Sequence, residues 1–312
     1  MPTADNVSRL QSGADAECLH FQKIAQQGHG GGRRGVSQQG IYAVAPSGKL
    51  LASLNSNDPA QVLQMLERGL ERWKQLSREE RLGLELPSAE QTDVRRPERF
   101  YPEGGLVLRV SSRDLPRENT PATPGADWRQ TAWNHDFAWF TREEARRIVP
   151  EQPVVGAKRR ITDALVRRLA RAHLVDNVRG ETQPYAEENI ERAEWSSELV
   201  KVEGKALTLR LTGATRAAAE GMWSIGGLRR PEPTPQKRGH ETTLLGNAKY
   251  DLDRQKFTAF EMIALGSRWG GSQFNQRSDD LAVAPIGTLF VMAADAPVER
   301  VAPAFFRQYG WE

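Results

Sequence analysis

The stretch from Gly40 to Trp73 limits the possible folds of this chain most, because signals for strand, turn, strand and helix follow one another in it. Gly40–Ala45 contains the β-branched and aromatic residues typical of strands. The Pro-Ser-Gly sequence at 46–48 has turn composition, since proline presets φ and glycine tolerates a positive φ. Lys49–Leu54 returns as an antiparallel strand, so the sequence predicts a hairpin.

A helix is predicted directly after this hairpin. Asn57 or Asp58 can cap it, and Pro59 stands in its first turn, where proline is well tolerated. Apolar or small residues recur at helical spacing and predict one packed face. That face consists of Val62, Met65, Leu66, Gly69, Leu70 and Trp73.

With a further helix predicted over Asp15–Gln27, residues 15–73 follow the order helix, strand, strand, helix. This order resembles the C-terminal half of a thioredoxin-like domain. The resemblance implies a partial thioredoxin-like α/β module over residues 1–76. The family's CxxC motif has no counterpart in the sequence, and Ser-Gln-Gln at 37–39 stands where the family places a cis-proline. The resemblance therefore implies a redox-inactive module that serves as a structural or docking unit.

The length of the chain predicts a second domain. With 312 residues, of which 38% are hydrophobic, the chain can bury a sizeable core and exceeds the usual size of one domain. Residues 77–105 are charged and contain three prolines, which predicts a linker. Residues 106–312 then form the second domain, and we expect an α+β fold overall.

Hydrophobic alternation predicts a strand at residues 106–110, hairpins at 195–211 and 242–265, and a last strand at 286–293. Two helices precede the hairpins. One has a capping box of Thr141 and Glu144, and the other spans Ile161–Val175 with arginines, including Arg168, on its outer side. The proline- and arginine-rich composition of residues 223–239 predicts an exposed connection. Strands in hairpins with inserted helices favour a mostly antiparallel α+β domain.

The charge balance narrows the class of partner. Lys and Arg number 43 against 40 Asp and Glu, a formal net charge of +3, which argues against a nucleic-acid partner. The sequence contains no apolar run long enough to span a bilayer and no signal peptide after Met1. We therefore expect a soluble, cytoplasmic protein with no membrane span, or an exported one if the true N-terminus lies upstream of Met1.

Cys18 is the only cysteine, so the sequence predicts no disulfide within the chain and no thiolate metal centre. We predict no metal and no cofactor. A single-cysteine thiol redox function through Cys18 is one hypothesis, with His20 as its base. Residues two positions apart on a helix point in different directions, which favours a buried structural role for the thiol instead.

Four titratable residues, together with Arg268, form a second hypothesis, in which the chain is an enzyme acting on a small polar or anionic substrate. His135 and Asp136 are adjacent in one segment, and His173 and Asp176 lie at the end of a predicted helix. The hypothesis requires these side chains to converge on one cleft, because a general base must lie within hydrogen-bond reach of its proton. Whether the protein is an enzyme is left open by the sequence.

A long glycine-containing loop after the second hairpin carries the leading hypothesis. Its glycines allow close backbone approach, and its side chains can stack on a ligand and donate hydrogen bonds to it. We expect a non-catalytic protein that binds a small polar ligand or another protein through this loop. The predicted ligand-binding residues are Arg268, Trp269, Gln273, Asn275 and Arg277.

Overall fold

The computed structural model describes residues 7–31, 37–82, 97–117, 128–226 and 231–311. The chain forms two compact units, residues 1–96 and residues 97–312. Each unit has its own core, and the two are described separately. The unit boundary falls inside the predicted linker, of which residues 83–96 lie outside the described part of the chain.

Unit 1 contains the predicted hairpin and its closing helix. Strands β1 and β2 pair antiparallel, and α3 packs on them. Asp58 caps α3 by accepting a hydrogen bond from the Gln61 amide at 2.9 Å, and Pro59 is the first helical residue, as predicted. The elements are α1 (Val7–Ser12), α2 (Ala16–Gln26), β1 (Ile41–Val44), β2 (Leu50–Leu54), α3 (Pro59–Gln75) and α4 (Arg78–Arg81).

The packed face of α3 is narrower than the sequence predicts. Met65 is fully buried, and Gly69 lets the helix approach the hairpin so closely that an added Cβ would lie 3.2 Å from the Cβ of Ala43. Leu66 and Leu70 are 47% and 54% exposed, so their assignment to this face was wrong. The face is narrow because two strands cover less of a helix than a full sheet does.

The likeness of unit 1 to a thioredoxin-like domain stays a prediction.

Unit 2 is built on one eight-stranded sheet in which all pairs are antiparallel, so the α+β prediction is confirmed. The strand order is β4-β3-β10-β9-β8-β7-β6-β5. The strands are β3 (Leu106–Asp114), β4 (Trp133–Phe140), β5 (Lys158–Arg160), β6 (Ile190–Glu203), β7 (Ala206–Trp223), β8 (Thr234–Asp251), β9 (Lys256–Trp269) and β10 (Ala284–Met292).

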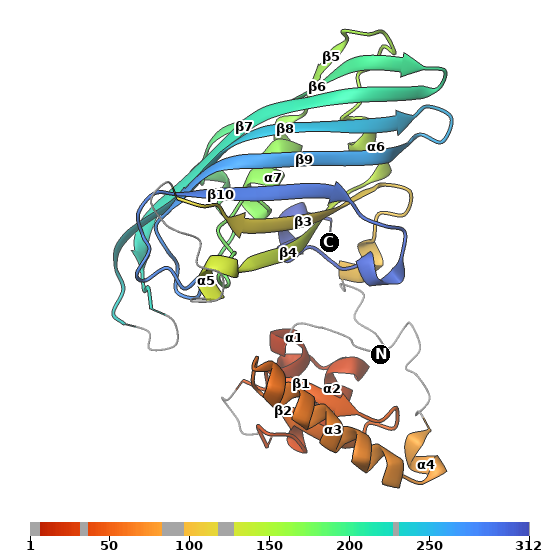
Figure 1. The fold of residues 1–312 in the computed structure, drawn as a ribbon, viewed down its shortest axis with the longest axis vertical. Helices are drawn as coiled ribbons and strands as arrows, with labels where there is room; N and C mark the ends of the chain where they lie inside the picture. Colours follow the sequence, from red (N-terminus) through yellow and green to blue (C-terminus); the bar gives the residue numbers. More distant parts are fainter. Residues whose placement is uncertain (1–6, 32–36, 83–96, 118–127, 227–230, 312) are drawn as a thin grey trace. The chain divides into compact units, whose positions relative to one another are not determined.

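Helices α6 (Arg142–Arg146) and α7 (Asp163–Ala172) lie against one face of this sheet, which curves around them (Figure 1). We call this the inner face and the opposite one the outer face. The core fills the inner face and includes Trp195, Phe290 and Leu169. The predicted capping box of α6 is present, with Thr141 and Glu144 each bonding the other's backbone amide. The remaining short helices are α5 (Trp128–Thr131), η2 (Pro97–Phe100), η3 (Glu187–Asn189), η5 (Pro297–Glu299) and η6 (Phe306–Tyr309).

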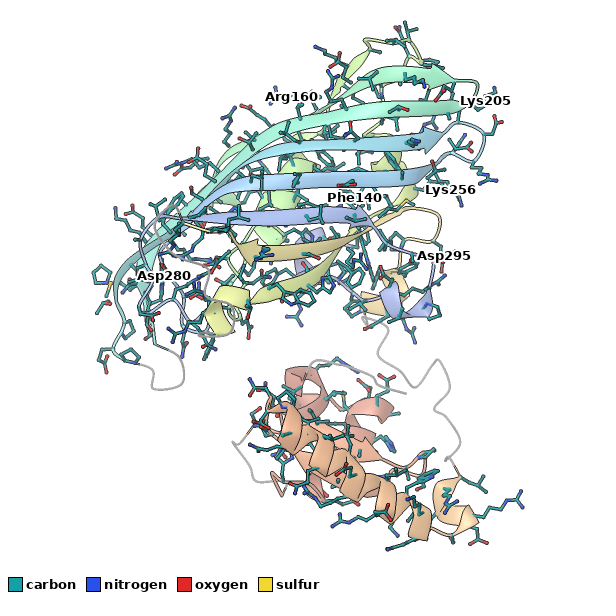
Figure 2. The ribbon with its side chains drawn as sticks, in the orientation of Figure 1. Phe140, Arg160, Lys205, Lys256, Asp280 and Asp295 are labelled. Atoms are coloured by element: carbon teal, nitrogen blue, oxygen red, sulfur yellow. The ribbon has the colours of Figure 1, made fainter. Side chains whose placement is uncertain are left out.

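The C-terminal segment covers part of β3 and β4. Phe306 and Tyr309 pack with Val107, Phe137 and Trp139 beside β4, the edge strand of the sheet. The turns at Lys205 and Lys256 mark one end of the long hairpins, while Asp280 lies at the opposite end of the sheet (Figure 2). Between the C-terminal cluster and the Asp280 end, the outer face is open to solvent.

Three details of unit 2 differ from the sequence prediction. Residues 234–239 are not a connection but the first part of β8, since they pair with β7 up to Trp223. Arg168 is buried rather than exposed, because Glu144 holds its guanidinium at 2.7 and 2.9 Å. Residues 97–105 were assigned to the linker but belong to unit 2, where Phe100 and Tyr101 pack on the C-terminal cluster.

Candidate functional site

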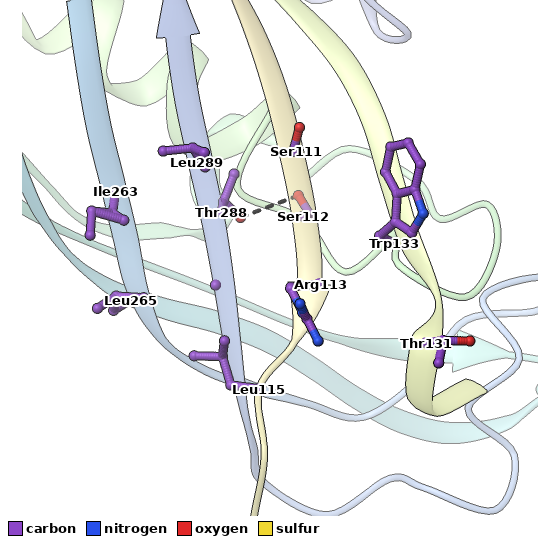
Figure 3. A pocket seen from close by; sticks show the side chains of 11 residues that line it. Ser111, Ser112, Arg113, Leu115, Thr131, Trp133, Ile263, Leu265, Thr288 and Leu289 are labelled. Atoms are coloured by element: carbon purple, nitrogen blue, oxygen red, sulfur yellow. Dashed lines mark hydrogen bonds between the residues drawn. The ribbon is translucent and has the colours of Figure 1, made fainter. Parts of the chain in front are cut away.

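A pocket on the outer face of unit 2 is a candidate functional site. It encloses about 550 Å³ between β3, β4, β9 and β10 (Figure 3). We call it the Trp133 pocket. Its apolar walls are Trp133, Leu115, Ile263, Leu265 and Leu289, and its polar lining includes Ser111 and Arg113.

The strand register explains why these residues meet. One row of cross-strand neighbours runs Trp133, Arg113, Gly287, Leu265, and the next row runs His135, Ser111, Leu289, Ile263. Side chains two residues apart on a strand share a face, so both rows point to the outer face. The rows alternate with the inner-face residues Ser112 and Thr288, which are buried and bonded to each other at 3.2 Å.

Gly287 forms the floor of the pocket. A Cβ added at this position would lie 3.2 Å from Leu115 Cδ2 and 3.4 Å from Leu265 Cδ2. The leucine side chains on either side therefore lie close over this glycine. A larger residue at 287 would fill space that a ligand can use.

Trp133 forms one wall and is 61% exposed, although a tryptophan side chain is usually largely buried. Its ring meets the His135 ring edge-on, with centroids 4.7 Å apart. His135 Nδ1 lies 3.0 Å from Ser111 Oγ and 3.3 Å from the carbonyl oxygen of Val110. A carbonyl oxygen can only accept, so Nδ1 carries the proton and donates to it. In this tautomer His135 does not withdraw a proton from Ser111.

The pocket has one positively charged lining residue. Arg113 Nε donates to the carbonyl oxygen of Asp114 at 3.4 Å, and within the described residues no carboxylate pairs with its guanidinium. The nearby cations Arg117 and Arg129 are ion-paired with Asp280 and Asp279. Arg113 is therefore the cation that this site offers to a ligand.

Two of the predicted catalytic residues do meet, on the inner side of β4. His173 Nδ1 lies 2.8 Å from Asp136 Oδ2, and His173 Nε2 lies 2.7 Å from the Tyr309 hydroxyl. The amide of Trp139 donates to the Tyr309 oxygen, so the tyrosine proton goes to Nε2 and the other ring nitrogen donates to Asp136. Burial raises the pKa of Tyr309, which keeps it a donor.

This Asp136–His173–Tyr309 chain fixes the C-terminal segment to α7 and β4. Asp136 also accepts from the Ala304 amide at 2.9 Å, and all three side chains are less than 9% exposed. His135 points to the opposite face of the same strand, since neighbouring residues alternate. The residues of the enzyme hypothesis are thus placed in separate surroundings, with Asp176 in a third.

Asp176 belongs to a buried ion-pair network that also contains two of the predicted ligand-binding residues. Arg277 donates to both oxygens of Asp176 and of Asp114, at 2.7 and 2.8 Å in each case. Arg268 pairs with Asp280, and both arginine side chains have 0% exposure. Burial alone would raise the pKa of Asp114, but the Arg277 guanidinium holds it below its ordinary value.

The other side chains of the predicted binding loop also contact residues of their own chain. The Asn275 side chain accepts from the Ser272 amide at 2.9 Å and is buried. The Trp269 ring lies over Gly239, and Arg216 stacks on it at 5.2 Å from the centroid. Gln273 is half-buried. Recognition of a polar ligand by this loop stays a prediction, and the arginines already serve carboxylates of their own chain.

Cys18 of unit 1 is fully buried on α2. Its Sγ lies 3.1 Å from Asp15 Oδ2 and 3.4 Å from the carbonyl oxygen of Arg9. His20 points elsewhere and lies against the turn at Gly48. The proposed base therefore lies apart from the thiol, as the helical spacing predicts.

The sequence reasoning missed the Trp133 pocket. One pattern in the sequence could have revealed it. In β9 and β10, apolar residues occupy both alternating sets of positions, so that Ile263, Leu265 and Leu289 stand between buried neighbours. An antiparallel strand with one solvated face normally alternates instead. Apolar residues on the solvated side are therefore a mark of a binding surface.

Comparison with protein-family models, with curated proteins and with solved structures gave no match for this chain. Over the described ranges, no group of three or more His, Cys, Asp or Glu side chains is arranged to hold a metal ion. Within the same ranges, the helices are all too short or too polar to cross a membrane.

Proposed function

We propose that this chain is a non-catalytic binding protein whose Trp133 pocket takes up an apolar small molecule. The observation that carries the proposal is the pocket of about 550 Å³ with mainly apolar walls. Protein sites for small molecules enclose roughly 300–1,000 Å³, with apolar walls and a few polar groups that orient the ligand. Ser111 and Arg113 are the polar groups here.

The exposed apolar residues support this proposal because they are grouped. Single exposed apolar side chains are common on protein surfaces, but contiguous ones mark interaction sites. Leu265 is 44% exposed, Leu289 38% and Ile263 37%, and they adjoin Trp133 around the same pocket. A ligand that covers them removes apolar surface from water, which drives binding. The lining therefore favours an apolar ligand over the polar one predicted for the Trp269 loop.

A neutral fluorescent probe tests the proposal. N-phenyl-1-naphthylamine brightens in apolar surroundings and carries no charge, so its titration should show saturable binding to a single site. Replacing Trp133 by alanine should weaken the affinity about tenfold, since covering a large apolar side chain stabilises by roughly 1.5–3 kcal/mol and only part of the ring contacts the probe. Gly287→Val should abolish binding, because it fills the floor of the pocket.

Met222→Ala provides the matched control. Met222 is 63% exposed on β7 and does not line the pocket, so its removal should leave probe affinity unchanged. Circular dichroism of every variant checks that the sheet is intact. Equal probe affinity in the wild type, Trp133→Ala and Gly287→Val proteins would contradict the proposal.

A second candidate function rests on the distance of 3.0 Å between Ser111 Oγ and His135 Nδ1 beside the pocket. A serine next to a histidine is the arrangement of an ester hydrolase. The bond from Nδ1 to the Val110 carbonyl opposes this function, because it uses the nitrogen as a donor. Hydrolysis of p-nitrophenyl butyrate that disappears in both Ser111→Ala and His135→Ala would establish it over simple binding.

A further inference from the structure

We infer that the ligand of the Trp133 pocket is a monomeric alkyl carboxylate, with its carboxylate on Arg113 and its chain lying across β10 and β9 toward β8. This inference rests on the proposed function and names the class of ligand. Three observations carry it: a cation without a carboxylate partner, a narrow apolar band that continues from the pocket, and carboxylates along the sides of that band.

Arg113 supplies the head-group site. Its guanidinium lines the pocket, and in the part of the chain that the structure describes it has no carboxylate partner. Two nearby arginines, Arg117 and Arg129, each pair with an aspartate. A guanidinium presents parallel N–H groups that match a carboxylate, so an anionic head group is the complement of this site.

The band begins beside Arg113 and leads away from it. Gly287 is the cross-strand neighbour of Arg113, and Leu265 is the neighbour of Gly287. In the adjacent row, Leu289 neighbours Ile263, and Ile263 neighbours Leu245 on β8. Leu245 is 53% exposed, although it lies beyond the pocket lining. The apolar surface therefore extends across three strands from a single cation.

The flanks of the band argue for one chain rather than for a membrane surface. On one side Glu261 follows Ile263 on β9 as the next outer-face residue. On the other side Ser267 follows Leu265, and its cross-strand neighbour on β8 is Glu241, which pairs with Arg216. On β9 the band is thus two side chains wide, with about 7 Å between rows along the strand. An anionic bilayer would meet both glutamates, whereas a single alkyl chain fits between them.

The geometry sets the preferred chain length. From β3 to β8 there are three inter-strand spacings of about 4.8 Å, so head site and band end are about 14 Å apart. An extended alkyl chain of about eleven carbons spans this distance. Because the chain keeps one side in water, we expect about half the full burial energy per methylene, which is about twofold in affinity for each carbon.

The experiment is a competition series against N-phenyl-1-naphthylamine on the full chain. Octanoate, decanoate and dodecanoate should displace the probe with affinities that rise about fourfold per two carbons and level off beyond dodecanoate. Dodecanoate should bind about tenfold more tightly than dodecanol, since a charge-assisted hydrogen bond is stronger than a neutral one. Arg113→Gln should remove this preference for the acid, and Arg113→Lys should keep part of it.

Arg109→Gln is the matched control, because Arg109 lies on the same face of β3 but pairs with Glu299 outside the pocket. It should leave the acid preference unchanged. Probe binding at Trp133 together with equal affinities for dodecanoate and dodecanol would overturn this inference and leave the proposed function standing. Absence of probe binding would overturn both. Trp133-dependent sedimentation with phosphatidylcholine–phosphatidylglycerol vesicles would overturn it in favour of a membrane surface.

Discussion

His240 of β8 is expected to make the stability of unit 2 fall between pH 7 and pH 5. The side chain is 1% exposed on the inner face, with Ala217 and Arg268 as its cross-strand neighbours. Among the described residues, neither of its ring nitrogens has a hydrogen-bond partner. A charged imidazole would lose its hydration there without compensation. Burial therefore lowers the pKa of His240 from 6.5 to about 4.

The sign of the effect follows from proton binding. Between pH 6.5 and pH 4 the unfolded chain binds a proton at His240 and the folded chain does not, so acid favours unfolding. One pKa unit corresponds to about 1.4 kcal/mol, and the two pKa values predict a loss of about 2 kcal/mol between pH 7 and pH 5. The half-buried carboxylates Asp114 and Asp280 titrate at lower pH. Their pKa values lie below 3.8, so the stability they contribute is lost only as pH falls through that range.

Urea unfolding at pH 7 and at pH 5, followed by tryptophan fluorescence, measures this difference. Seven of the eight tryptophans belong to residues 97–312, so the signal reports mainly on unit 2. His240→Leu removes the titrating group and the two unsatisfied nitrogens while keeping apolar volume. It should raise stability at pH 7 by about 1 kcal/mol and abolish most of the loss at pH 5.

His135→Gln is the control for this prediction, because His135 is an exposed histidine of the same sheet. Its removal should leave the loss between pH 7 and pH 5 in place. The reasoning is refuted if His240→Leu loses as much stability at pH 5 as the wild type. It is also refuted if His135→Gln abolishes the loss.

Three further changes test other parts of the structure. Arg277→Met leaves two buried carboxylates without their main partner and should cost about 3–5 kcal/mol in urea unfolding, whereas a change below 1 kcal/mol would mean that the network is hydrated. Tyr309→Phe removes the hydroxyl that joins His173 to β4 and should cost about 1–3 kcal/mol, with faster amide exchange in the C-terminal segment as the readout. In unit 1, Met65→Ala should lower the free energy of unfolding by about 2–5 kcal/mol and so speed amide exchange of the hairpin and α3. Leu66 is exposed, so Leu66→Ala should change this free energy by less than about 1 kcal/mol. Equal effects of the two variants would contradict the observed packed face of α3.

The hairpins and capped helices could be predicted because their signals are local. The turn at Pro46, the cap at Asp58 and the capping box at Thr141 each involve residues a few positions apart. The long β6–β7 and β8–β9 hairpins likewise join neighbours in sequence, so alternation alone gives their register.

The surroundings of the polar residues could not be predicted, because they depend on distant partners. Arg277 was expected to face a ligand, but Asp114 and Asp176, 163 and 101 residues away in sequence, bury it by neutralising its charge. The Trp133 pocket could not be predicted for the same reason, because it also depends on partners distant in sequence. Gly287 becomes its floor only because β10 pairs with β3, a neighbour that no local pattern in the sequence specifies.

The buried ion-pair network and the Trp133 pocket lie on opposite faces of the sheet at the same end of β3. Successive residues of a strand point to opposite faces, so Arg113 projects to the pocket and Asp114 to the network. Arg277 and Arg179 both hold the Asp114 carboxylate, at distances of 2.7 to 3.0 Å, which fixes the backbone that carries Arg113. Arg277 belongs to the loop that the sequence suggested as a ligand-binding surface, so this loop supports the strand end behind the Trp133 pocket.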